Sequence, residues 1–135
     1  MGGLSEKAKT LNKIRENTKG RLINVDAGNF LFKRKGQFSS ESKEGITAKA
    51  IAEIYSLLGF DAVAVGGNDL SGGISLLLET VTLGVPWTSA NIFDSEGKPV
   101  FEPFRRRQIG DLSIAIVGIS DPESFVSTDL VIRKG

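Results

Sequence analysis

The chain has 135 residues, enough for one domain with a single hydrophobic core, and we expect one domain over residues 1–135. Its 17 Lys and Arg residues against 16 Asp and Glu give a net charge of +1, so no electrostatic argument favours a nucleic acid polymer or an anionic membrane as partner. The absence of cysteine and histidine excludes disulfides, thiolate chemistry and histidine acid–base catalysis. Any site must therefore use oxygen ligands.

The first third of the chain predicts a helix, a strand and a loop. Apolar residues recur at helical spacing over 4–19, and Gly20 ends the helix. Residues 21–26 read as a short strand that leaves through a sharp turn at 27–29. Residues 31–45 mix glycine, serine and charge without a period, which indicates a long exposed loop. Phe32 and Phe38 in this loop have no explanation from the sequence.

The next elements alternate between helix and strand. An amphipathic helix is predicted over 46–58, a buried strand over 61–66 and a second helix over 73–83, before Pro86. A strand follows at 87–91. Phe60 and Trp87 lie beside these strands, so we expect both in the core.

The remaining segments predict a hairpin that interrupts this alternation. Residues 94–99 form a turn, and 105–108 lead through Gly110 and Asp111 into a strong strand at 112–119. A basic run of three residues in a hairpin, here Arg105–Arg107, is usually a solvated face. The order of elements predicts an α/β sandwich of a largely parallel sheet with flanking helices plus a β-hairpin.

Polar residues follow three of the predicted strands at the point where each ends. Parallel strands bring these ends to one edge of the sheet, where oxygen side chains suit a hard cation such as Mg, Ca or Mn. The same residue types are standard in turns for purely structural reasons, and both interpretations stay open. The possible ligand rim consists of Asp26, Asn29, Asn68, Asp69 and Asn91.

Two other kinds of site find little support. Gly66-Gly67 and Gly72-Gly73 match neither phosphate-binding glycine pattern at a strand-to-helix junction. The loop serines, Ser39, Ser40 and Ser42, have no histidine to activate them. Nucleophilic serine catalysis is thereby excluded.

The order of several segments resembles a known family. The segments are Gly2-Gly3-Leu4, 22–30, 58–66, 89–92, 97–99 and 112–119. In order and spacing they are similar to the N-terminal domain of 5'-nucleotidases and UDP-sugar hydrolases of the calcineurin-like metallophosphoesterase superfamily. The resemblance implies part of the αββα fold of that superfamily.

The family's two-metal motifs are degenerate at the matching positions. The resemblance places the aspartate that bridges the metals at Asn29, the metal-binding asparagine at Gly67 and the motif histidine at Asn68, and only Asp69 keeps its type. The family's Asp-x-His motif would precede Met1, and its downstream histidine motifs would follow Gly135. Two divalent cations about 3.5–4 Å apart need a bridging anion, which a neutral Asn29 amide does not supply.

These observations leave three hypotheses. The first is a non-catalytic metallophosphoesterase-like scaffold or binding module, with no cofactor, in a larger protein or assembly. The second is a metal-dependent phosphoric ester hydrolase of nucleotidase type, using two metals such as Mn, Mg or Zn and completed by segments or chains not present here. The third is a structural site for a single Ca or Mg.

Partner and compartment are expectations of a more general kind. A partial domain of this fold leaves a sheet edge or an apolar face uncovered, which favours another protein chain or a homo-oligomer as partner. The chain shows no run of about 18 apolar residues, so no membrane insertion is expected, and it shows no secretory signal. The family resemblance alone implies an extracytoplasmic location.

Overall fold

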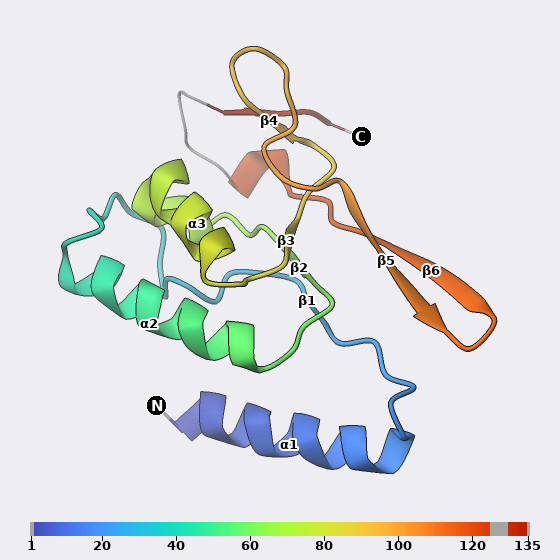
Figure 1. Ribbon diagram of the computed structural model, residues 1–135. Helices are drawn as coiled ribbons and strands as arrows, with labels where there is room; N and C mark the ends of the chain where they lie inside the picture. The colour runs from blue at the N-terminus through green and yellow to red at the C-terminus, as the bar shows by residue number, and fades with distance from the viewer. Residues whose placement is uncertain (1, 125–129, 135) are drawn as a thin grey trace.

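The computed structural model describes residues 2–124 and 130–134 of the chain (Figure 1). Three α-helices are present: α1 (Gly2–Thr18), α2 (Lys43–Leu57) and α3 (Gly73–Thr82). Two short 3-10 helices, η1 (Asp69–Gly72) and η2 (Pro122–Ser124), accompany them. The strands are β1 (Val25–Asp26), β2 (Ala62–Ala64), β3 (Trp87–Thr88), β4 (Ile92–Phe93), β5 (Phe104–Ile109), β6 (Leu112–Val117) and β7 (Val131–Ile132).

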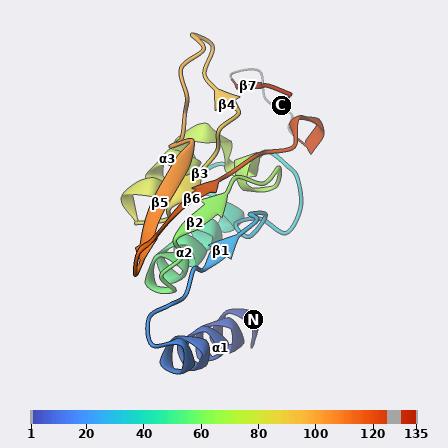
Figure 2. The same ribbon diagram turned by 90° about the vertical axis from the view of Figure 1, so that its right-hand side faces the viewer.

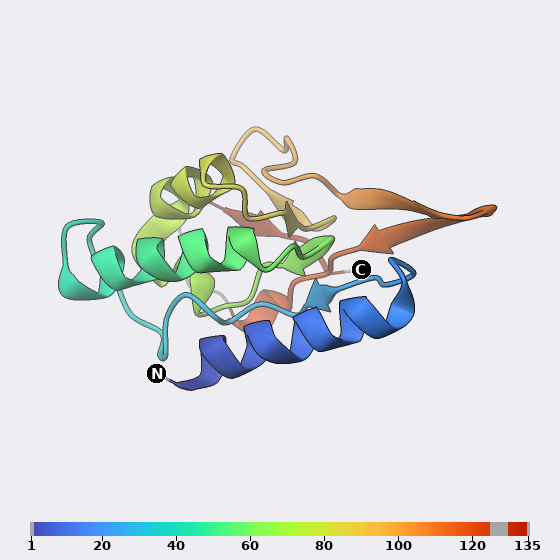
Figure 3. The ribbon, with the colours of Figure 1, turned by 60° about the horizontal axis from the view of Figure 1, so that its bottom comes forward.

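A parallel sheet of strand order β1-β2-β3 forms the centre of the fold. β1 is followed by α2 and β2 by α3, and each of these helices returns the chain to the next strand. Because such crossovers are nearly always right-handed, consecutive neighbours place both helices on one face of the sheet. Figures 1 and 3 show α2 and α3 there, with α1 running alongside α2. The predicted α/β class with a parallel sheet is therefore confirmed.

The strand register decides which side chains enter the core. Asp26 pairs with Val63 and Val63 with Trp87, so these three share one face of the sheet. Val63 and Trp87 are buried beneath the helices. Val25 and Thr88 belong to the opposite face, where Val25 remains 53% exposed.

Aromatic residues fill the space between the sheet and the helices. The indole Nε1 of Trp87 donates a hydrogen bond to the Thr80 hydroxyl at 2.8 Å, so its one polar atom is satisfied. Phe60 and Trp87 are buried, as predicted. Phe32, unexplained by the sequence, also belongs to the core, and Phe38 stacks on it with ring centroids 5.3 Å apart.

Helix α1 contacts the rest of the fold through one apolar face and through polar side chains, among them Arg15. Leu4, Ala8 and Leu11 recur at helical spacing and pack against the core cluster. The Arg15 guanidinium donates hydrogen bonds to the carbonyls of Leu58 and Gly59, which directly follow α2. Arg15 thereby joins the end of α1 to the end of α2.

The hairpin of β5 and β6 extends away from the sheet in Figure 1 and points toward the viewer in Figure 2. Its expected solvated arginines differ from one another. Arg106 and Arg107 are exposed, and Arg107 Nε also forms an ion pair with Asp61 at 2.6 Å. Arg105 is half-buried, and its Nε is buried without a hydrogen bond to a described residue. The prediction of a solvated basic run therefore holds for two of the three residues and is wrong for Arg105.

The predicted elements are present, but their boundaries shift where side chains cap or bend the chain. α2 begins at Lys43 rather than at residue 46, because the Ser42 hydroxyl accepts a hydrogen bond from Gly45 N–H and caps the helix. The strands predicted over 21–26 and 61–66 are reduced to Val25–Asp26 and Ala62–Ala64. Among the residues described, no helix is long and apolar enough to cross a membrane.

Candidate functional site

The loops that follow β1 and β2 meet on the carboxylate of Asp69. Its Oδ2 accepts hydrogen bonds from the backbone N–H groups of Asn29 at 2.6 Å and Gly66 at 2.9 Å. Its Oδ1 accepts from Phe30 and Leu31, both at 3.0 Å. The side chain is fully buried, and two carboxylate oxygens offer about four acceptor positions. Backbone donors therefore occupy all of them.

The protonation of Asp69 reflects two opposed effects. Burial raises the pKa of the Asp69 carboxyl, whereas the backbone N–H groups around it lower that pKa. Since every neighbour is a donor, a protonated carboxyl would turn its own O–H toward an N–H group. The ionised form matches these partners, and the carboxylate binds the two loops together.

Asn29 and Asn68 lie directly beside this carboxylate. The Asn29 backbone adopts the left-handed region, with φ of 62°, which asparagine tolerates better than most residues. Its side-chain oxygen accepts a hydrogen bond from Asn68 N–H at 2.8 Å. A Cβ at Gly66 would overlap the Asn29 side chain, so the two turns fit only with glycine there. The structure thus brings together Asn29, Asn68 and Asp69.

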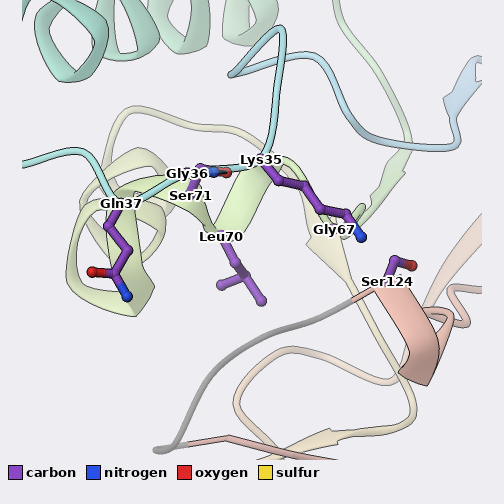
Figure 4. A pocket seen from close by; sticks show the side chains of 7 residues that line it. All are labelled: Lys35, Gly36, Gln37, Gly67, Leu70, Ser71 and Ser124. Carbon is purple, nitrogen blue, oxygen red and sulfur yellow. Dashed lines mark hydrogen bonds between the residues drawn. The ribbon is translucent and has the colours of Figure 1, made fainter.

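Gly67 faces a neighbour that fills the place of a side chain. A Cβ built on Gly67 would lie 2.5 Å from the Ser124 carbonyl oxygen and 2.7 Å from Ser124 Cβ. Figure 4 shows Ser124 of η2 opposite Gly67, with Lys35 reaching toward them along a pocket of about 330 Å³. Leu70, Ser71 and Gln37 also line this pocket. Any larger residue at position 67 would have to displace η2.

Asp26 is placed differently from the other residues of the predicted rim. The register turns it toward the helices, where its Oδ2 accepts from Lys7 Nζ at 2.7 Å and Tyr55 hydroxyl at 3.1 Å. Its Oδ1 accepts from Gly28 N–H at 2.9 Å. Asp26 therefore attaches α1 and shapes the turn after β1. A sequence pattern gives no signal for the contact with Lys7, because the two residues come from separate elements.

Asn91 forms a second network, which the sequence did not reveal. Its Nδ2 donates to the carbonyls of Ser120 at 2.7 Å and Arg133 at 3.0 Å. Its Oδ1 accepts from Ser120 N–H at 2.9 Å and Ser89 hydroxyl at 3.2 Å. Ser120 Oγ in turn donates to the carbonyl of Val65, at the end of β2. The amide is saturated and serves to join three segments.

The residues present do not fit a two-metal centre. Within residues 2–124 and 130–134, no three Asp or Glu side chains gather as metal ligands. Asp69 and Asn91 have no unused oxygen position, Asn29 holds a backbone N–H, and position 67 has neither a ligand atom nor room for one. A binuclear metal site is thus not assembled by these side chains alone.

The role of Asp69 can be tested by replacing its carboxylate with an amide. Asp69→Asn would present an NH₂ group to backbone donors and leave buried N–H groups unpaired, so we expect a loss of about 2–4 kcal/mol in the free energy of unfolding. Urea denaturation followed by circular dichroism measures it. Asp111→Asn, the same change at an exposed hairpin turn, should have little effect. Equal stability of the two variants would contradict the structural role.

The contact between Lys7, Asp26 and Tyr55 predicts a response to alkaline pH. Burial lowers the pKa of Lys7, but its hydrogen bonds to Asp26 and Tyr55 outweigh this and leave the pKa raised. Burial also raises the pKa of Tyr55. A lysine whose pKa is raised in the folded state stabilises the fold below the pKa that it has in the unfolded chain. This stabilisation is lost as the pH rises through the pKa of the folded state. Ionising the buried phenol of Tyr55 lowers the stability over the same pH range.

We therefore expect the free energy of unfolding to fall above about pH 10, where unperturbed lysine and tyrosine side chains titrate. In the Lys7→Met variant, the free energy of unfolding should depend less on pH between about pH 9 and 12. The control is Lys9→Met, because Lys9 is exposed on the same helix. Thermal melts at stepped pH provide the measurement. An unchanged slope in Lys7→Met would show that this contact does not attach α1.

Comparison with known proteins finds one kind of relative in sequence and several in fold. No protein-family model matches the chain. Protein UshA from Escherichia coli is 33% identical over 89 residues, which cover 58% of this chain and 16% of UshA. Sulfate thiohydrolase SoxB from Thermus thermophilus aligns over 96% of this chain and 24% of its own, with a TM-score of 0.75 and 21% identity. Calcineurin-like phosphoesterase YfkN from Bacillus subtilis aligns over 93% of this chain and 44% of its own, with a TM-score of 0.68 and 16% identity.

At these identities the solved structures establish the fold, and UshA adds the relationship in sequence. The chain spans 16% of the length of UshA, so the activity of a whole protein of this kind does not follow from the match. The resemblance found in the sequence is nevertheless confirmed. In sequence and in fold, this chain resembles part of a calcineurin-like metallophosphoesterase domain of the 5'-nucleotidase type.

Proposed function

We propose that this chain is a non-catalytic metallophosphoesterase-like domain that acts as a scaffold or binding module within a larger protein or assembly. The observation that carries the proposal is the packing of Gly67 against Ser124, at the position where the resemblance expects a metal-binding asparagine. A side chain is missing there and its space is filled. Hydrolysis by a two-metal mechanism needs both cations held on the attacking and leaving oxygens.

The neighbouring positions support the same interpretation. Asn29 replaces the bridging carboxylate with a neutral amide, and its oxygen already accepts the Asn68 N–H. Asp69, the one residue that keeps the type found in the family motif, uses both oxygens on backbone donors. These hydrogen bonds would have to break before either side chain could bind a metal, at a cost of about 1–3 kcal/mol for each buried donor left unpaired.

The alternative is a nucleotidase-type hydrolase whose remaining ligands come from segments or chains outside this one. This alternative is compatible with the comparison to UshA, because the alignment covers only 16% of that protein. In that case the rim would need to rearrange around incoming ligands, with Ser124 moving away from Gly67. An extracytoplasmic location, proposed from the family resemblance, suits either alternative.

Measurements of metal content and of turnover distinguish the non-catalytic domain from the nucleotidase-type hydrolase. We expect the purified chain, incubated with Mn, Mg or Zn and desalted, to retain no stoichiometric metal in mass spectrometry and to hydrolyse neither AMP nor a nitrophenyl phosphate ester. The Asn29→Asp variant should behave the same way, because position 67 still lacks a ligand. Two metals per chain together with turnover would overturn the proposal and support an unorthodox hydrolase.

We further propose that another protein chain, such as a second copy, covers an apolar patch at the edge of the sheet and the base of the hairpin. In this patch Val25 is 53% exposed and Val117 is 55% exposed, and the two line the same shallow hollow beside the buried Thr88. Phe104 pairs with Val117 across the hairpin and is 44% exposed. Apolar patches of this kind commonly mark protein interfaces.

Light scattering tests this surface. We expect a species of at least twice the 14.5 kDa of one chain, and the Val117→Arg variant should return to the mass of one chain because a charge in an apolar interface is costly. Leu57→Arg is the matched control, since Leu57 is an exposed apolar residue at the end of α2. A monomeric wild-type chain at high concentration would count against this proposal.

A further inference from the structure

A second pocket lies between the loop after β1 and the outer surface of α2. Its volume is about 330 Å³, at the lower end of the range of roughly 300–1,000 Å³ typical of small-molecule sites. Its apolar lining comes from Phe30, Leu31, Phe32, Phe38 and Ile51. It does not include Gly67, Asn68 or Asp69, so it is distinct from the degenerate metal positions.

The floor of this pocket is fixed by the core. Leu31 is 3% exposed and Phe32 is 4% exposed, so neither side chain needs a ligand to hold it in place. Phe38 stacks on Phe32 with an angle of 12° between the ring planes. The backbone at Leu31 is tied to Asp69 by its N–H. An apolar lining is thus preformed, which reduces the ordering cost of binding.

The rim of the pocket is cationic. Lys33, Arg34 and Lys43 line it, against a single carboxylate, that of Glu44. All three cations are exposed, and none forms an ion pair with a described residue. The Arg34 guanidinium carbon lies 5.5 Å from the centre of the Phe38 ring, which positions the charge above the apolar floor.

We propose that this pocket binds a small organic anion with a flat apolar body, such as an aromatic carboxylate, sulfonate or phosphate. The apolar body lies on the aromatic floor, and the anionic group meets the cationic rim. An inorganic anion would leave the apolar floor unused, whereas a neutral aromatic would leave the three cations unpaired. The combination of floor and rim therefore selects molecules that carry both features.

The inference goes beyond the proposed function and does not depend on it. The metal and turnover experiment concerns Asn29 and Gly67, and the pocket between the loop and α2 can hold a ligand whatever that experiment shows. Its own test uses a different probe and different variants. Failure of one proposal is therefore distinguishable from failure of the other.

Anilinonaphthalene sulfonate provides an aromatic anion whose fluorescence reports binding, and phenyl-naphthylamine provides a similar body without the charge. We expect saturable binding of the sulfonate by the wild-type chain and weaker binding of the neutral analogue. Lys43→Glu should lower the sulfonate affinity about five- to tenfold, because attraction becomes repulsion near the anionic group. It should leave the affinity for the neutral analogue within about twofold on the same reasoning.

Lys43 suits this experiment because it is the first residue of α2. A glutamate there is compatible with the helix dipole, so the variant should fold at least as well as the wild type. Lys13→Glu, at an exposed position of α1, makes the same change of charge away from the pocket and should keep wild-type affinity. This control separates local attraction from the effect of net charge.

A second variant tests occupancy by filling the pocket. Thr47 lines it from an exposed position on α2, so Thr47→Trp should block both probes without removing a core side chain. A melting temperature close to that of the wild type confirms that this variant is folded. Absence of sulfonate binding by the wild type, or unchanged binding by both Lys43→Glu and Thr47→Trp, would overturn the proposal and assign any fluorescence to other apolar surfaces.

Discussion

The rest of the structure depends on one buried carboxylate. Asp69 accepts four backbone N–H groups from two loops that are about forty positions apart in the chain. Without it, each of these donors would lose its partner, at a cost that is largest for the buried N–H groups of Leu31 and Gly66. The turns after β1 and β2 would then have no common partner. The carboxylate therefore fixes the edge of the sheet where the turns after β1 and β2 meet.

The loops at this edge of the sheet are held by polar contacts within the chain. The Asn29 side-chain oxygen accepts a hydrogen bond from Asn68 N–H, and the Asp69 carboxylate accepts hydrogen bonds from backbone N–H groups. Because these bonds lie within the chain, the geometry of the loops does not need a cation. Ser124 then occupies the space beside Gly67. Asn91, which follows β3, is also held by hydrogen bonds within the chain, because its amide joins the segments of Ser120 and Arg133.

The two faces of the central sheet serve different purposes. On one face, Asp26 attaches α1 through Lys7, and the aromatic core continues into the floor of the pocket against α2. On the other face, Val25 remains accessible beside the base of the hairpin. The proposed ligand pocket and the proposed interface thus lie on opposite sides of the same strands, because alternate residues of a strand point to opposite faces.

The sequence by itself determined the order of elements, the fold class, the burial of Phe60 and Trp87 and the meeting of Asn29, Asn68 and Asp69. Hydrophobic period and turn residues are local properties, and parallel strands bring their ends together by necessity. Only the tertiary structure decided that Asp26 faces α1, that Phe32 belongs to the core, that Ser124 fills the place beside Gly67 and that Asn91 bonds Ser120. These contacts join residues far apart in the chain, and their hydrogen bonds and packing depend on distances that no local pattern encodes.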